Sequence, residues 1–96
     1  MNKQQVIEIL RQHRSELAAR GVKDLFLFGS VARGEESPRS DVDLLVEFSQ
    51  PVGLFQFIEL QQKLESLLGC KVDLGTPRSL KPRIRERVLQ EAIRVA

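Results

Sequence analysis

The chain has 96 residues, of which 42% are hydrophobic and 29% charged, and its formal net charge is +2. These values are typical of a globular domain of ordinary size, and we assign the whole chain, residues 1–96, to one domain. Its longest apolar runs are far shorter than the roughly 20 residues that span a bilayer. The single cysteine, Cys70, excludes an internal disulfide, and the N-terminus shows no secretion signal, so we expect a cytoplasmic protein with no membrane partner.

Charge is distributed unevenly along the sequence. Residues 35–48 carry five acidic groups and one basic group, whereas residues 77–96 carry six basic and two acidic groups. The chain has no Trp or Tyr on which single-stranded nucleic acid would stack, and its net charge is small, so we do not expect direct nucleic-acid binding. We interpret the basic stretch near the C-terminus as a solvated helix face, in preference to a site for phosphate or RNA. It comprises Arg78, Lys81, Arg83, Arg85 and Arg87.

The N-terminal part of the sequence predicts a helix followed by a buried strand. The helix is expected over residues 3–19, where apolar side chains recur near a 3.6-residue period. Asn2 and Gln5 have the spacing of a capping box at its start, and Gly21 marks its end. Residues 25–28 form a continuous apolar run, Leu-Phe-Leu-Phe, which indicates a strand buried on both faces.

The remainder of the sequence predicts two more strands and two more long helices. After a short helical turn and a loop, residues 41–48 (DVDLLVEF) alternate between polar and apolar side chains, as a strand does. A helix is expected over residues 54–68 and a third strand over residues 70–74. A final helix is expected from Pro82, with five apolar residues on its inner side: Ile84, Val88, Leu89, Ala92 and Ile93. The order αβαβαβα favours an α/β (α+β) fold, in which helices flank a small sheet of three or four strands.

Two short motifs carry the chemistry. Gly29 and Ser30 are followed, after ten residues, by Asp41 and Asp43. Two aspartates at i and i+2 of a strand project from one face, with Cα atoms about 7 Å apart. Their repulsion would keep one of them protonated, and a divalent cation such as Mg²⁺, which prefers one or two carboxylates plus substrate phosphates, removes that conflict. Because the Gly-Ser pair lies where a strand gives way to a helical turn, its backbone N–H groups point toward an anion. The pattern favours two metal ions and a nucleoside triphosphate.

Asp73 is the third acidic candidate, because it alternates with apolar neighbours on the expected strand 70–74. If that strand lies beside strand 41–48, about 4.8 Å away, Asp73 would complete an acidic cluster, as a metal ligand and as a base for an attacking hydroxyl. Taken singly, each motif is more common as a solvated strand face, a loop turn or a surface acid than as a site. Their joint position at the strand ends of one small sheet favours an active site, and Arg33 is near enough to assist at a phosphate.

Residues 27–34 (LFGSVARG), the gap after them and residues 40–46 (SDVDLLV) resemble the minimal nucleotidyltransferase (MNT) family of the DNA polymerase beta superfamily. The similarity extends through residues 64–69 and 72–74 and covers nearly the whole chain. The resemblance implies the nucleotidyltransferase fold, a small mixed sheet flanked by helices. It also implies that the Gly-Ser pair contacts the triphosphate of ATP, and that the three aspartates bind Mg²⁺ and catalyse the transfer. The candidate nucleotide-binding residues are Gly29, Ser30, Arg33 and Ser40, and the candidate catalytic and metal-binding residues are Asp41, Asp43 and Asp73.

Members of this family that stand alone at this size are similar to antitoxins whose partner is a HEPN-domain toxin, a ribonuclease. The resemblance implies transfer of AMP from ATP to a tyrosine hydroxyl of the toxin, within a complex of the two proteins. An alternative is an antitoxin that neutralises its partner by masking it. Leu54, Phe55 and Phe57 offer an apolar surface for that purpose, although we expect these side chains to belong to the core. Modification of a small molecule is a third and weaker interpretation, because such enzymes carry an additional domain for the acceptor.

Overall fold

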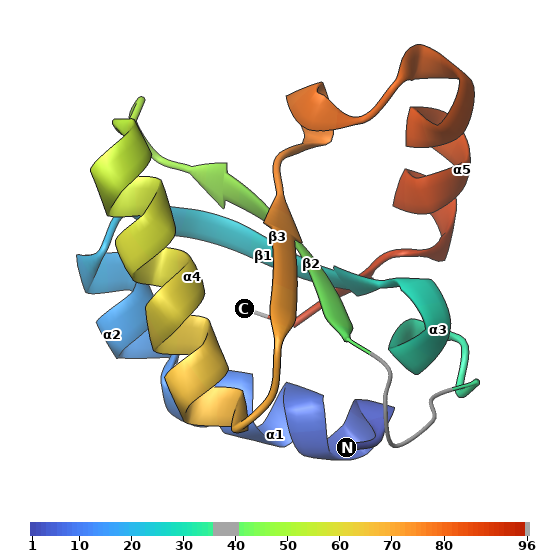
Figure 1. Cartoon of the computed structure of the whole chain (residues 1–96), viewed down its shortest axis with the longest axis horizontal. Helices are drawn as coiled ribbons and strands as arrows, with labels where there is room; N and C mark the ends of the chain where they lie inside the picture. The colour runs from blue at the N-terminus through green and yellow to red at the C-terminus, as the bar shows by residue number, and fades with distance from the viewer. Residues whose placement is uncertain (36–40, 96) are drawn as a thin grey trace.

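The computed structural model describes residues 1–35 and 41–95. Within these residues, a mixed sheet of four strands has the order β3-β2-β1-β4 (Figure 1). Strand β1 is antiparallel to both β2 and β4, while β2 and β3 are parallel. The strands are β1 (Val22–Phe28), β2 (Val42–Phe48), β3 (Val72–Gly75) and β4 (Ile93–Arg94). The helices are α1 (Lys3–Gln12), α2 (Arg14–Ala19), α3 (Gly29–Ala32), α4 (Leu54–Leu68) and α5 (Pro82–Glu91), with a 3₁₀ turn η1 (Pro77–Ser79). The expected α/β class is confirmed, and the sheet has its fourth strand.

All three strands expected from the sequence are present, with shifted ends. The first extends back to Val22, and the second and third begin at Val42 and Val72 rather than at Asp41 and Cys70. Strands β2 and β3 are joined by α4, which is the crossover connection that parallel strands need. The expected helix and strand order therefore holds, and it determines which residues meet at the ends of the strands.

The N-terminal helix differs from its expectation, because it is interrupted at His13. The capping box is confirmed: the Asn2 side chain accepts from the backbone N–H of Gln5, and the Gln5 side chain accepts from the backbone N–H of Asn2, each at 2.9 Å. The backbone of His13 has φ −105° and ψ 16°, outside the helical range, so α1 and α2 are separate helices. This break changes the direction of the chain, and α2 inserts Leu17, 1% exposed, into the core.

The core lies on one side of the sheet, where α1, α2 and α4 pack (Figure 1). Alternate residues of the strands point into it, including Leu25 and Leu27 of β1 and Leu44 of β2, all fully buried. Helix α4 contributes three leucines at four-residue spacing, Leu60, Leu64 and Leu68. Each such side chain contributes about 1.5–3 kcal/mol by leaving water. The side chains at the intervening strand positions point to the opposite side, where the acidic residues lie.

Helix α4 has the bounds that the sequence predicts and ends at Gly69, whose φ of +69° lies in the left-handed region. The expectation that its first residues belong to the core was wrong for Leu54 and Phe55, which are 70% and 82% exposed. Phe57 is half-buried and packs against Phe48, with ring centroids 6.4 Å apart. Neither α4 nor any other helix in the described residues is long and apolar enough to cross a membrane.

The last helix also differs from its expectation. Helix α5 ends at Glu91, because Ala92 adopts an extended conformation (φ −68°, ψ 139°). Ile93 then joins the edge strand β4, and the N–H of Val95 donates to the carbonyl of Leu25 at 2.8 Å. Of the apolar residues that were expected to continue the inner side of the helix, Ile93 belongs to this strand and Ala92 lies between the helix and the strand. No residue of α5 is buried, and Figure 1 shows the helix away from α1, α2 and α4, next to α3.

Candidate active site

The turn at the end of β1 brings the backbone of Gly29 against the carboxylate of Asp43 on the neighbouring strand. Gly29 has φ +76°, in the left-handed region that glycine adopts readily. A Cβ atom built at this position would overlap with Oδ2 of Asp43. From the sequence, we expected Gly29 to let the backbone come close to a phosphate. The structure adds a contact that sequence reasoning missed: the residue leaves room for the acid that follows it by fourteen positions in the chain.

Two of the three acidic candidates lie side by side in the sheet. Asp43 is opposite Phe28 on β1 and opposite Asp73 on β3. Partners in a parallel pair project from the same side of the sheet, and neighbouring strands are about 4.8 Å apart. The prediction that the strand of Asp73 lies beside the Asp-x-Asp strand is therefore confirmed. Asp41 lies directly before β2 and is exposed, as is Asp73, while Asp43 is half-buried.

The half-buried carboxylate has a perturbed acidity. The pKa of Asp43 is raised from 3.8 to about 6, first by burial and then by the nearby carboxylates of Asp73 and Asp41, against the opposing charge of Arg33. Asp41 and Asp73 are thus both close enough to Asp43 to oppose its ionisation, as the sequence predicts. A carboxyl group that is costly to ionise alone, among like charges, is a group that a bound cation would stabilise.

The chemistry of these donors fits a Mg²⁺ ion. Carboxylate oxygens are its preferred protein ligands, and the repulsion felt by Asp43 indicates a local excess of negative charge. Across residues 1–35 and 41–95, no three Asp, Glu, His or Cys side chains converge closely enough to enclose a metal by themselves. Mg²⁺ seldom occupies such a cage, because it keeps several waters and binds through one or two carboxylates together with phosphate oxygens. The acidic residues therefore suit a metal that arrives with a nucleotide.

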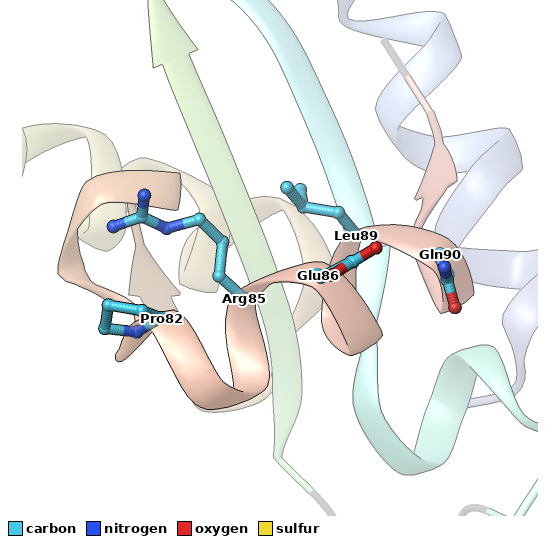
Figure 2. A pocket seen from close by; sticks show the side chains of 5 residues that line it. All are labelled: Pro82, Arg85, Glu86, Leu89 and Gln90. Carbon is cyan, nitrogen blue, oxygen red and sulfur yellow. The ribbon is translucent and has the colours of Figure 1, made fainter.

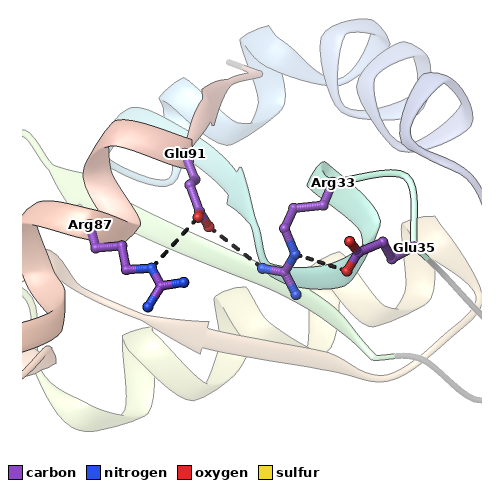
Figure 3. Close-up of polar contacts among 4 residues, drawn as sticks. All are labelled: Arg33, Glu35, Arg87 and Glu91. Atoms are coloured by element: carbon purple, nitrogen blue, oxygen red, sulfur yellow. Dashed lines mark hydrogen bonds and ion pairs between the residues drawn. The ribbon is translucent and has the colours of Figure 1, made fainter.

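Arg33, directly after α3, is held by carboxylates from two directions (Figure 3). Its Nε lies 3.1 Å from Oε2 of Glu35, and its Nη1 lies 3.5 Å from Oε2 of Glu91 on α5. Arg87 makes a longer contact of 3.9 Å with the same Glu91. The pKa of Arg33 is raised, first by its hydrogen bond to Glu35. Nothing in the sequence singles out Glu91, which is 58 positions from Arg33.

The structure brings most of the candidate nucleotide-binding residues to one end of the sheet. Ser30 is the second residue of α3 and half-buried, and its carbonyl accepts from the N–H of Glu35 at 2.8 Å. Gly29, Ser30 and Arg33 therefore adjoin Asp43 and its acidic neighbours Asp41 and Asp73, a group that we call the acidic row. Ser40 lies outside the described residues, and its assignment stays a prediction.

Comparison with known proteins shows the family to which this chain belongs. Residues 5–95 match the nucleotidyltransferase domain family, and the chain belongs to it. It is similar to protein adenylyltransferase MntA of Thermococcus cleftensis, with 45% identity over 93 residues that cover 96% of this chain and 94% of that protein. Among solved structures, it is similar to a candidate minimal nucleotidyltransferase, with 42% identity, a TM-score of 0.83 and coverage of 97% and 95% of the two chains. A toxin–antitoxin structure with AMP-PNP shares 27% identity and a TM-score of 0.70, over 100% of this chain and 73% of that one.

These similarities confirm the resemblance to the minimal nucleotidyltransferases, and they identify the chain as a nucleotidyltransferase by family. They also confirm the fold that the resemblance implies, a mixed sheet flanked by helices. The Gly29 turn lies against Asp43, which is opposite Asp73 on the side of the sheet that faces away from the core. The assignment of these residues to one active site stays a prediction.

Proposed function

We propose that this chain transfers AMP from ATP to a hydroxyl group of a HEPN-domain toxin, a tyrosine by expectation, and that it thereby acts as an antitoxin. The observation that carries the proposal is the alignment of Asp43 with Asp73, directly beside the Gly29 turn. The relatives support the choice of reaction and partner, since one is named a protein adenylyltransferase and another is a toxin–antitoxin complex with an ATP analogue.

In the proposed reaction the acceptor oxygen attacks the α-phosphorus of ATP. A bond forms between that oxygen and the phosphorus, the bond to the bridging oxygen of the β-phosphate breaks, and pyrophosphate leaves in line with the attack. Asp73 is exposed and accepts the proton of the hydroxyl, as a general base must do from within hydrogen-bond reach. The products are an AMP ester of the partner and pyrophosphate.

The other site residues bind and orient the donor. Ser30 donates its hydroxyl to a phosphate oxygen, beside the backbone N–H groups of α3, and Arg33 supplies positive charge near the same group. Asp41 and Asp43 would hold Mg²⁺, with Asp73 as the third candidate ligand. When bound, the metal supplies charge neutralisation at the phosphates and polarises the reacting oxygens. Ser40 stays a candidate for the nucleotide.

The proposal is tested with ATP labelled at the α-phosphate and a purified HEPN-domain partner. Wild-type protein is expected to label the partner, and Asp43→Asn and Asp73→Asn to lower the rate at least a hundredfold. Asp24→Asn is the matched control, because Asp24 lies on β1 of the same sheet but pairs with Arg94 at 2.8 Å and is opposite Glu47, four residues along β2 from Asp43. ATP labelled at the γ-phosphate should transfer nothing. Undiminished transfer by both site variants would contradict the assigned mechanism.

Neutralisation by masking is the second candidate, and the exposure of Leu54 and Phe55 favours it. Two adjacent large apolar side chains that are mostly exposed mark a surface that a partner would cover. The two candidates separate in cells that produce the toxin. Under the transfer mechanism, Asp43→Asn abolishes protection although the complex still forms. Under masking, the same variant protects fully, and Phe55→Glu does not.

A further inference from the structure

Helix α5 is amphipathic, yet none of its residues is buried in the described structure. Ile84 and Leu89 are 47% and 41% exposed, and Val88 is only half-buried. Apolar residues at helical spacing ordinarily pack against a core, and here the core lies on the other side of the sheet. The helix thus presents an apolar surface of the kind that a protein partner covers.

A hollow of about 490 Å³ lies along this helix (Figure 2). Its lining residues follow one side of α5 at helical spacing: Pro82, Arg85, Glu86, Leu89 and Gln90. The guanidinium of Arg85 is anchored at one end, where Nη2 donates to the carbonyl of Leu80 at 3.2 Å. The hollow is open to solvent, and it combines the apolar side chains of Pro82 and Leu89 with charged and polar groups, which is a surface on which an apolar side chain of a partner can pack.

The charge around the hollow indicates the chemistry of the partner. Residues 78–91 contain five basic and two acidic groups. One of the two acids, Glu91, already faces Arg33 and Arg87. The exposed basic groups, Arg83 among them, complement an acidic surface. Because the helix has apolar residues between its arginines and no aromatic residue on which a base would stack, this complement is an acidic protein surface rather than RNA.

The position of α5 relative to the acidic row distinguishes it from the other exposed apolar surface. Through Glu91 the helix reaches Arg33, whose charge acts on Asp43. Leu54 and Phe55 instead follow the far end of β2, and the strand from Asp43 to Phe48 alone spans about 17 Å. A partner whose hydroxyl must reach Asp43 and Asp73 can cover α5 at the same time, whereas one seated on Phe55 covers the opposite end of the sheet.

We propose that α5 is the surface on which the acceptor protein docks: an acidic patch of the partner pairs with its arginines, and an apolar side chain enters the hollow at Leu89. This inference rests on the proposed function, since it names the surface that delivers the acceptor hydroxyl to the carboxylates. It assigns a role to the basic stretch near the C-terminus, for which the sequence favoured a solvated helix face.

The test measures two quantities with the HEPN-domain partner: the dissociation constant of the complex and the rate of AMP transfer. Leu89→Glu places a negative charge in the hollow, and we expect both complex affinity and transfer to fall at least tenfold. Arg83→Glu should slow association and make it less sensitive to salt. Ile58→Glu is the control, because it introduces the same charge at an apolar residue of α4 with nearly the same exposure as Leu89, 38% against 41%, and should leave transfer within twofold.

Binding of Mg²⁺ and AMP-PNP, measured by calorimetry, shows whether each variant retains its nucleotide site. Leu89→Glu is expected to bind the analogue as the wild type does, which separates docking from damage to the site. Wild-type transfer with equal transfer by Leu89→Glu and Arg83→Glu would overturn the docking surface and leave the proposed function intact. Absence of transfer by the wild type would instead contradict the proposed function. RNA binding by the wild type is measured as well. If Arg83→Glu loses RNA binding and transfers AMP as the wild type does, α5 binds RNA rather than the acceptor protein, and the inference is overturned.

Discussion

The clearest stability prediction concerns Asp43→Asn, which should make the protein more stable at neutral pH while it abolishes catalysis. The amide has nearly the shape of the carboxylate and no charge. The pKa of Asp43 rises from 3.8 to about 6 in the folded protein, first because of burial and then because of its acidic neighbours. Ionisation of this group therefore opposes folding, and the substitution removes that opposition.

The size of the effect follows from the same values. A rise from 3.8 to about 6 corresponds to about 3 kcal/mol at 1.36 kcal/mol per pKa unit. Because Asp43 is only half-buried, solvent screens much of this energy, and we expect about 1 kcal/mol. The destabilisation is absent well below pH 3.8, where the group is protonated in both states, grows as the pH rises from 3.8 to about 6, and is complete above about pH 7. For a domain of this length, 1 kcal/mol corresponds to about 4–8 °C in Tm.

Thermal unfolding of metal-free protein, followed by circular dichroism at pH 4 and pH 8, measures the effect. Asp43→Asn should raise Tm by about 4–8 °C at pH 8 and by much less at pH 4, where only a small part of the effect has developed. Added Mg²⁺ should stabilise the wild type at pH 8 and the variant much less, since a cation that binds only the folded state shifts its stability. Asp24→Asn, which breaks the 2.8 Å pair with Arg94, should give no gain at either pH. A variant that is less stable than the wild type at pH 8 would refute the reasoning.

Three further substitutions test other contacts. Gly29→Ala should lower Tm and reduce transfer at least a hundredfold, because its Cβ would overlap with Asp43. Gly34→Ala is its control: this residue also has a positive φ of +74°, but no atom lies within 4 Å of the added Cβ, so the change should cost only backbone strain of about 1–2 kcal/mol. Thermal unfolding and the label-transfer assay compare the two variants. Glu91→Gln removes the carboxylate that holds Arg33, and it should weaken AMP-PNP binding two- to fivefold in calorimetry, the size of an exposed ion pair. Arg87→Gln is the control, because it leaves the contact between Glu91 and Arg33 in place. The same affinity in the two variants would contradict this prediction. Val95→Ala, at a residue 1% exposed, should cost about 2 kcal/mol in urea unfolding, and a cost below 0.5 kcal/mol would show that its packing does not stabilise β4.

The acidic row could be predicted from the sequence because its determinants are local. Asp41 and Asp43 alternate with apolar residues, so the strand and its polar face follow from the period of the side chains. Asp73 has the same pattern on a strand that one helix separates from β2. That topology favours adjacent strands, and the structure places Asp73 in register with Asp43.

The parts that could not be predicted depend on contacts between distant segments. The break at His13 and the burial of Leu17 depend on how α2 meets the sheet, which the helical period does not encode. Ile93 has the spacing of a helix face, but pairing with β1 made it a strand residue. The ion pair between Arg33 and Glu91 joins residues 58 positions apart, and no local pattern indicates such a pair.

The C-terminal segment, residues 82–95, has few backbone contacts with the rest of the domain, and it is therefore a candidate for local unfolding. Strand β4 contributes two residues to the sheet, and Val95 adds one further hydrogen bond, to Leu25. Val95 is the one buried residue of the segment 82–95, so this segment is expected to detach while β1 and β2 stay paired. Amide hydrogen exchange in α5 should therefore be faster than in β1, and a bound partner would slow it. In that case, a partner bound to α5 would order the helix and, through Glu91, fix the position of the Arg33 side chain.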